Sequence, residues 1–321
     1  MNSSAIRCEA VVREFGGVAA VNGVDLDVEA GEIYGFLGPN GAGKSTTVRM
    51  LCTLLAPTSG AASVAGFDVV EHPGEVRLRI GAALQEAALD PRQTGTELLL
   101  LQGRLYGLSR VAARRRVDEL GELIDLGDAL ARRIATYSRR MKRRLDLAAA
   151  LIHNPDILFL DEPTTGLDPV SRAVVWEEVR RLNTDLGMTV FLTTQYLEEA
   201  DALAGRVGII DHGRIVAEGT PADLKRAIGS DMIVARVEGD PRAACAAVEH
   251  VDGVIGVEAH GNEIVVSTGD GPATISAVAV ALSQCGVPIR DLTLRTPTLD
   301  DVFLELTGTR IDNETTKKEA A

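Results

Sequence analysis

The chain has 321 residues, of which 45% are hydrophobic and 25% charged, a length and composition typical of about two globular domains. Its formal net charge of −13 argues against sequence-wide binding to nucleic acid. Its apolar runs, such as residues 277–282, are far shorter than the ~18 residues needed to span a bilayer, and the N-terminus lacks the apolar stretch of a signal peptide. We therefore expect a cytosolic chain that needs another polypeptide for any work within a membrane.

Cysteine and histidine residues form no recognisable pattern. The four cysteines and five histidines are scattered along the chain and match neither a zinc-site spacing nor a disulfide framework. We expect no metal site built from these two residue types.

Alternating apolar and polar residues at the start of the chain predict antiparallel strands. Turn signals at Asn22-Gly23 and Ala30-Gly31 divide residues 1–35, and the run "EIYGFLG" at residues 32–38 is nearly all apolar. We expect the earlier strands to pair with one another and this last strand to be buried.

Residues 38–46, "GPNGAGKST", match the full phosphate-loop pattern G-x-x-x-x-G-K-[ST]. The glycines let backbone N–H groups turn inward around phosphates, and a helix N-terminus adds partial positive charge. An accidental glycine-rich turn is disfavoured, because the match follows a predicted strand and precedes an apolar helical stretch. The predicted nucleotide-binding residues are Gly38, Pro39, Asn40, Gly41, Ala42, Gly43, Lys44, Ser45 and Thr46, with Lys44 on the β- and γ-phosphates and Ser45 on Mg²⁺.

Residues 94–135 have helical character. Thr96 is the expected N-cap of the first helix, and Val117, Leu120 and Ile124 recur at helical spacing in the next. The stretch that follows, residues 136–151, concentrates cations: Arg139, Arg140, Lys142, Arg143 and Arg144. Taken alone such a cluster suggests a nucleic-acid patch, which the acidic chain disfavours. We expect the last three of these cations on an exposed helix face.

Two short apolar runs, residues 155–163 and 188–194, flank a helical segment, and this rhythm predicts a parallel βαβ unit. We expect the helix to end at Gly187. Its predicted apolar face is formed by Val175, Val179, Leu182 and Leu186. A hairpin over residues 206–219, turning at His212-Gly213, is expected to close the domain.

The first of these runs ends in two adjacent carboxylates. Asp161 comes at the carboxyl end of the predicted buried strand, a position that suits Mg²⁺ coordination in a phosphate-loop enzyme. Glu162 is placed to polarise the attacking water, a general-base role worth ~10²–10⁴ in rate. A solvated acidic pair is the alternative, and the phosphate loop in the same chain argues against it.

The remainder of the chain predicts a second, smaller domain. From residue 231 the element order is βαββαβ, the ferredoxin-like α+β pattern, followed by a last helix over residues 298–308. We assign residues 1–225 to a first domain with a helical part at about 90–150, residues 226–308 to this second domain, and residues 309–321 to a disordered tail. Three alternative roles are open for the second domain: stabilising a dimer, regulating the first domain, or covering apolar surface.

Residues 5 to about 220 resemble the ATP-binding subunits of ABC transporters, with several motifs in the family's order. The resemblance implies that Phe15 stacks on adenine, that Gln85 touches Mg²⁺ or the water, and that Ser138 belongs to the signature motif. It also implies that Asp168 lies in the D-loop, "GLD" at residues 166–168, and that Gln195 is the switch residue, which is usually histidine in the family. The implied fold is a phosphate-loop α/β core with a helical subdomain and an antiparallel β subdomain.

The C-terminal stretch "RTPTLDDVFLELTG" and Gln195 resemble the daunorubicin/doxorubicin-resistance type of the family. This implies an ATP hydrolase that drives efflux of a drug or antibiotic through a separate multi-span membrane permease, on the cytoplasmic side of the plasma membrane. It also implies a homodimer or heterodimer in which each ATP is held by the phosphate loop of one chain and the signature motif of the other. The alternatives are a low-turnover nucleotide-binding regulator and an ATPase acting on nucleic acid or the ribosome, although the latter usually carries two cassettes in one chain.

One departure from the family lies in the signature motif, which normally reads serine, glycine, glycine. Ser138 is kept, but Arg139 and Arg140 replace both glycines. Side chains at these positions occupy the space in which backbone N–H groups approach phosphate. Guanidinium groups can bind phosphate themselves, yet they cannot do so and leave the backbone geometry intact. We therefore expect impaired closure of the dimer and slow turnover.

Overall fold

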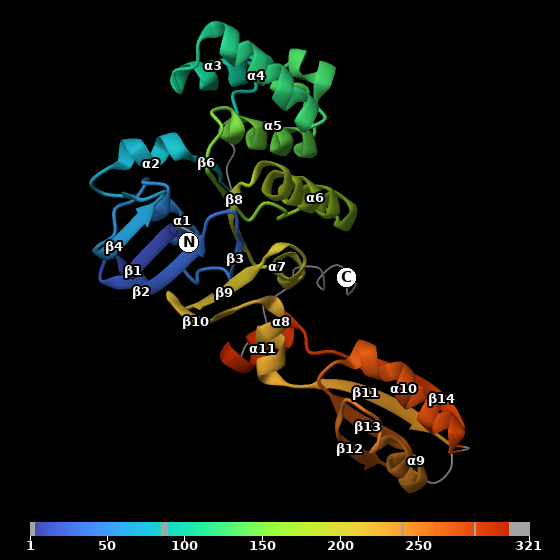
Figure 1. The fold of residues 1–321 in the computed structure, drawn as a ribbon. Coiled ribbons are helices and arrows are strands. Elements are labelled where there is room, and N and C mark those ends of the chain that lie inside the picture. Colours follow the sequence, from blue (N-terminus) through green and yellow to red (C-terminus); the bar gives the residue numbers. More distant parts are fainter. Residues whose placement is uncertain (1–3, 85–88, 239–240, 286, 308–321) are drawn as a thin grey trace, which may run out of the picture. The chain divides into compact units, whose positions relative to one another are not determined.

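The computed structural model describes residues 4–84, 89–238, 241–285 and 287–307 (Figure 1). The described chain divides into two compact units, one ending at Pro221 and the other beginning at Ala222. The sequence places this boundary a few residues later, at residues 225–226. Gln85 lies outside the described residues.

The first unit begins with an antiparallel sheet of order β2-β1-β4-β5. Its strands are β1 (Ser4–Phe15), β2 (Val18–Glu29), β4 (Ser59–Val64) and β5 (Phe67–Asp68). The expected turn at Asn22-Gly23 is wrong, because both residues lie inside β2, where Gly23 has φ 73° at an irregularity in the β1–β2 register. The hairpin turns instead at Gly16-Gly17, and the expected turn at Ala30-Gly31 is present.

The second sheet has the order β10-β9-β3-β8-β7-β6 and is parallel except at β10. Its strands are β3 (Ile33–Leu37), β6 (Ile80–Ala83), β7 (Ile157–Asp161), β8 (Thr189–Thr194), β9 (Arg206–Asp211) and β10 (Arg214–Gly219). Every residue of β3, β7 and β8 is buried, as expected for strands covered on both faces. The predicted buried strand, the parallel βαβ unit and the hairpin at His212-Gly213 are confirmed.

Four helices connect these strands: α1 (Lys44–Leu51), α2 (Pro73–Arg79), α6 (Pro169–Leu186) and α7 (Leu197–Leu203). On α6, Val179 and Leu182 are buried, whereas Leu186 is 57% exposed and does not continue the predicted apolar face. Gly187 ends the helix as predicted, in the left-handed conformation with φ 65°.

A helical part of the first unit comprises α3 (Gly95–Leu105), α4 (Arg110–Leu123) and α5 (Arg139–Leu151), with 3-10 turns at Gly127–Ala131 and Ile134–Thr136. The N-cap of α3 is Thr94, not Thr96 as predicted, because Thr94 and Glu97 form a reciprocal capping box. Thr96 instead donates its hydroxyl to the Leu130 carbonyl. The predicted apolar residues of α4 and its end, Val117, Leu120 and Ile124, are buried.

The second unit has the predicted βαββαβ order and the ferredoxin-like strand order β12-β13-β11-β14, antiparallel throughout. Its strands are β11 (Asp231–Val237), β12 (Val254–His260), β13 (Glu263–Thr268) and β14 (Ile289–Arg295). Its helices are α8 (Pro221–Ile228), α9 (Pro241–Val248), α10 (Gly271–Gln284) and α11 (Leu299–Thr307). Its own core is formed by residues such as Ile233, Val266 and Leu282. Of the helices in the described ranges, none combines the length and apolar character that a bilayer span requires.

Candidate nucleotide-binding site

The loop between β3 and α1 has the conformation that a phosphate loop requires. Gly41 and Gly43 have φ angles of 84° and 110°, in the left-handed region that side chains rarely adopt. A Cβ atom would lie 2.3 Å from the Ile210 carbonyl oxygen at Gly38 and 2.5 Å from the Ala20 carbonyl oxygen at Gly43. Because α1 begins at Lys44, its N-terminus adjoins the loop and favours an anion there.

Lys44 is held inside this loop by groups of its own chain. Its side chain is 4% exposed, and Nζ donates to the carbonyl oxygens of Gly38 (2.7 Å) and Pro39 (3.0 Å). Nζ also lies 3.6 Å from Oε1 of Glu162. Burial lowers the pKa of Lys44, and the neighbouring carboxylates of Glu162 and Asp161 act in the opposite direction. A buried cation with so little solvent is a natural partner for phosphate oxygens.

Asp161, Ser45 and Thr193 form a group of oxygen atoms beside Lys44. Oδ1 of Asp161, at the end of β7, accepts hydrogen bonds from Ser45 Oγ (3.2 Å) and Thr193 Oγ1 (2.5 Å). A carboxylate and a hydroxyl so close together fit Mg²⁺, which prefers oxygen ligands and takes only one or two from protein beside phosphate and water. These residues would hold Mg²⁺ directly or through water.

Glu162 adopts an unusual backbone conformation, with φ 49°. Its N–H donates to both the carbonyl oxygen and the side-chain oxygen of Thr193, each at 3.1 Å. Its Oε2 accepts from Thr165 Oγ1 at 3.2 Å. A non-glycine residue in this region is sterically strained, and such strain often marks a functional site. The contacts hold the carboxylate next to Lys44 with little solvent around it.

Strand register brings Gln195 to the same edge of the sheet. Leu37 pairs with Thr194, and Asp161 pairs with Thr193, so the carboxyl ends of β3, β7 and β8 are level with one another. Gln195 follows β8 directly and is 8% exposed. Its amide can donate and accept hydrogen bonds but carries no charge.

Other predicted site residues lie elsewhere on the first unit. Phe15 is 48% exposed at the end of β1, with the Arg13 guanidinium 4.6 Å from its ring centroid. Ser138 and Asp168 are the N-caps of α5 and α6, accepting from the backbone N–H groups of Met141 (3.2 Å) and Ser171 (3.0 Å). Within the described ranges, no hydrogen bond or ion pair joins Phe15, Ser138 or Asp168 to the phosphate loop. Their assignment to nucleotide binding stays a prediction.

The cations of α5 are less exposed than expected. Arg143 and Arg144 have side chains only 19% and 13% exposed, so the predicted exposed face is wrong for both. Arg143 pairs with Asp146 (3.3 Å), and Arg144 pairs with Glu178 (2.8 Å) and Asp125 (3.1 Å). The physical reason is that this side of α5 faces α6 rather than solvent. Glu178 of α6 is far from Arg144 in the sequence, so their pairing becomes visible only in the fold. Lys142 is half-buried.

The two arginines of the signature motif differ from these buried cations. Arg139 and Arg140 are both exposed at the N-terminus of α5. Arg140 is close enough to Glu178 to lower the pKa of that carboxyl, although burial raises it on balance.

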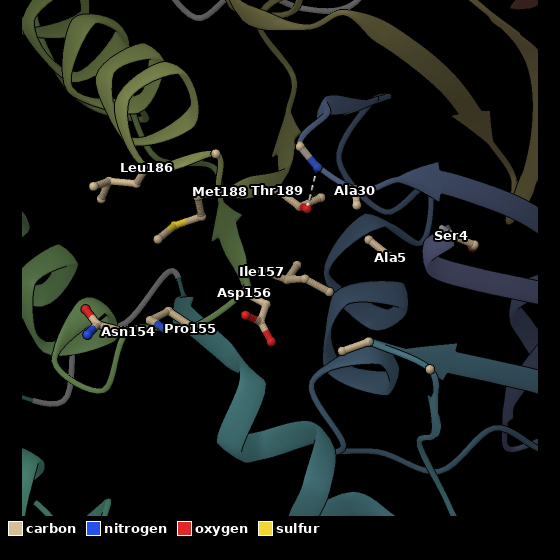
Figure 2. A pocket seen from close by; sticks show the side chains of 14 residues that line it. Ser4, Ala5, Ala30, Asn154, Pro155, Asp156, Ile157, Leu186, Met188 and Thr189 are labelled. Atoms are coloured by element: carbon tan, nitrogen blue, oxygen red, sulfur yellow. Dashed lines mark hydrogen bonds between the residues drawn. The ribbon is translucent and has the colours of Figure 1, made fainter. Parts of the chain in front are cut away.

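A cavity of about 680 Å³ lies at the opposite edge of the sheet, next to the first residues of β7 and β8 (Figure 2). Among the described residues that line it, Asp156 is the only ionisable one, and most of the others are small or apolar. Thr189 there accepts a hydrogen bond from the Gly31 N–H at 2.9 Å. The charged groups and the oxygen atoms that suit Mg²⁺ lie instead at the carboxyl ends of the strands.

Comparison with known proteins gives two family matches and several full-length relatives. Residues 21–165 match the family described as ABC transporter, and residues 219–307 match the family described as ATP-binding protein DrrA1-3-like, C-terminal domain. The daunorubicin/doxorubicin resistance ATP-binding protein DrrA of Streptomyces peucetius is 47% identical over 98% of this chain and 96% of its own length. The linearmycin resistance ATP-binding protein LnrL of Bacillus subtilis is 36% identical over 94% of this chain and 98% of its own length.

Solved structures resemble the first unit. An ATP-binding subunit of an ABC transporter superposes with a TM-score of 0.64 and 28% identity, covering 70% of this chain and 93% of the solved one. A dimeric ATP-binding cassette in a post-hydrolysis state with ADP and Pi superposes with a TM-score of 0.61 and 24% identity, over 67% of this chain and 98% of the solved one. The expected fold is confirmed.

The buried pair of Arg143 and Asp146 predicts a pH effect on stability. Burial raises the pKa of Asp146 to about 6 although Arg143 lowers it. The folded state therefore binds more protons than the unfolded state between about pH 4 and 6, so this group lowers stability as pH rises through that window. Asp146→Asn removes the titration, and its free energy of unfolding relative to the parent should increase by about 2 kcal/mol from pH 4 to pH 6.5.

Urea unfolding at several pH values measures this difference. Asp118→Asn, at an exposed position of α4, is the matched control and should leave the pH slope unchanged. Equal slopes for Asp146→Asn and the parent would show that Asp146 is not held in its neutral form by the fold.

Proposed function

The chain belongs to the ATP-binding proteins of ABC transporters, and we propose that it drives efflux of a drug or antibiotic through a separate multi-span membrane permease. Membership of this family makes the chain an ATP-hydrolysing transporter component. The names of its full-length relatives, resistance proteins for daunorubicin, doxorubicin and linearmycin, support a drug or antibiotic as cargo. They favour an exporter subunit over a nucleic-acid-directed ATPase or a low-turnover regulator. We place it on the cytoplasmic side of the plasma membrane, attached through the permease.

The observation that carries the proposal is the convergence of Lys44, Asp161 and Glu162 at one edge of the parallel sheet. Phosphates entering the loop would replace the Gly38 and Pro39 carbonyls as partners of Lys44, since a buried ammonium gains more from phosphate than from neutral carbonyls. Ser45 and Asp161 would hold Mg²⁺, which neutralises charge on the phosphate oxygens when bound. We assign the same loop's residues 38–46 to the triphosphate and Phe15 to the adenine ring.

We assign hydrolysis to Glu162 and Gln195. Glu162 lies next to Lys44, and its carboxylate is fixed by Thr165 and by its own constrained backbone, so it can orient a water for attack on the γ-phosphate. The Gln195 amide can hydrogen-bond a γ-phosphate oxygen. Gln85 is assigned to Mg²⁺ or the water.

We propose that the working form is a dimer of ATP-binding subunits, either two copies of this chain or one copy with a related chain. One solved neighbour of this fold is dimeric with ADP and Pi. Ser138 and Asp168 would then face the nucleotide of the opposite subunit, as exposed helix N-caps can. Arg139 and Arg140 would obstruct that approach and slow turnover.

A transport assay tests the proposed function. Vesicles that contain this chain and its cognate permease should accumulate a drug such as daunorubicin when supplied with MgATP, whereas vesicles with this chain alone should not. Lys44→Ala should abolish MgATP binding, because Lys44 is the cation buried in the loop. Transport by the chain alone, or undiminished transport with Lys44→Ala, would contradict the proposal.

The signature motif gives a second prediction. Changing Arg139→Gly together with Arg140→Gly should raise the ATPase rate at least about tenfold, because it restores one or two charge-assisted hydrogen bonds of roughly 1.5–3 kcal/mol each. MgATP affinity should change little, since the phosphate loop of the same chain lies elsewhere. Arg132→Gln with Arg133→Gln removes two exposed cations nearby and serves as the control for charge alone. If the double glycine variant hydrolyses ATP no faster than its parent, the arginines are tolerated.

A further inference from the structure

The first turns of α6 connect two segments that the proposed hydrolysis depends on. One is the loop of residues 166–168, which immediately precedes α6, and the other is the segment around Gln195, which follows β8. These segments are far apart in sequence. Side chains on one face of α6 contact both.

Arg172 makes the first of these connections. Its Nε donates to the Leu167 carbonyl oxygen at 3.2 Å, and its guanidinium carbon lies 4.0 Å from the ring centroid of Tyr196. A single side chain thus holds the loop before α6 and stacks on the residue next to Gln195. A planar guanidinium is needed for both contacts, because the stack and the Nε bond constrain its orientation together.

Trp176, one helical turn further on, makes the second connection. Its Nε1 donates to Oε1 of Glu199 at 3.1 Å, and Glu199 is fully buried on α7, which begins two residues after Gln195. Burial raises the pKa of Glu199, while the hydroxyls of Thr194 and Thr164, the Trp176 indole and the charge of Arg172 lower it. The Trp176–Glu199 hydrogen bond therefore ties α6 to α7, directly after the segment around Gln195.

The backbone of the segment around Gln195 is fixed between these contacts. The Tyr196 N–H donates to Thr194 Oγ1 at 2.8 Å, so Gln195 is bracketed by two residues that are both held in place. At long range, a neutral amide attracts phosphate more weakly than a charged imidazolium does. The amide must also be oriented correctly to donate a hydrogen bond. Its position consequently depends on Tyr196.

We propose that Arg172 is a positioning residue that couples Gln195 to the loop of residues 166–168, with Trp176 and Glu199 as the second anchor of the same coupling. A γ-phosphate bound by Gln195 shifts Tyr196, and the stacked Arg172 transmits that shift to Leu167 and to α6. This inference rests on the proposed function, because it takes Gln195 as the group that contacts the γ-phosphate.

Steady-state kinetics separate positioning from a structural role. Arg172→Gln and Tyr196→Leu should each lower kcat about tenfold with little change in KM for ATP, and the double variant should be no slower than the slower single variant. Tyr196→Phe keeps the ring and should stay near the parent, with Arg172→Lys between. Arg181→Gln, on the exposed side of α6, is the matched control. Additive effects of the two single variants, or unchanged kcat in both, would overturn the coupling.

The chain's one tryptophan gives a test that does not require turnover. Trp176 is that residue, and its indole is bonded to Glu199. A non-hydrolysable ATP analogue with Mg²⁺ should change its emission differently from MgADP, and Arg172→Gln should abolish that difference while both nucleotides still bind. A difference that persists in Arg172→Gln, or emission that is the same for both nucleotides bound to the parent, would overturn the inference alone. Failure of both nucleotides to bind the parent would overturn the proposed function and this inference with it.

Discussion

The candidate site depends on the register of three parallel strands, β3, β8 and β7. Because Leu37 lies beside Thr194 and Thr193 beside Asp161, the phosphate loop, the two carboxylates and Gln195 all begin at one level of the sheet. Thr193 secures this level twice, by donating to Asp161 and by accepting from the Glu162 N–H. A one-residue slip would turn each of these side chains to the other face of the sheet. Packing of fully buried strands therefore fixes the position of polar chemistry at their ends.

Two of the partners that hold Lys44 in the loop are neutral carbonyls, which are weaker partners than phosphate oxygens. Lys44 and Glu162 are both nearly solvent-free and lie 3.6 Å apart, and loop carbonyls supply the remaining partners of Lys44. Burial of an ammonium carries a large desolvation cost, which these contacts only partly offset. Phosphate oxygens offer Lys44 stronger partners and leave Glu162 available to water. Glu162 also has a strained backbone, which indicates that the fold has to enforce the position of this residue.

Local patterns predicted the strands at the start of the first unit, its phosphate loop, its βαβ unit and final hairpin, and the order of elements in the second unit, because each depends on neighbours in sequence; β4, β5, α2 and β6 were not predicted. One error was local, because the N-cap of α3 is decided by Thr94 and Glu97, three residues apart. Other errors arose where residues far apart in sequence decide. Asn22-Gly23 has the composition of a turn, but both residues lie within β2 at an irregularity in its register. Pairing of β2 with β1 continues before and after this irregularity. In the sequence, Arg143 and Arg144 look like surface residues. In the fold, Arg144 pairs with Glu178 of α6, and Arg143 pairs with Asp146 of its own helix. The contact of Arg172 with Tyr196 and that of Trp176 with Glu199 carry no local signal at all, since the partners in each pair lie over twenty residues apart.

The central claim is that Glu162 directs hydrolysis at the site that Lys44 and Asp161 form. Glu162→Gln keeps the shape of the side chain and removes its negative charge, so MgATP affinity should stay within about threefold while hydrolysis falls at least ~100-fold. γ-Labelled ATP followed over hours resolves even the slow turnover that we expect of the parent chain, and Glu177→Gln, with a side chain 65% exposed on α6, is the control. The account predicts bound, uncleaved MgATP in Glu162→Gln. Hydrolysis at the parent rate in that variant would contradict it.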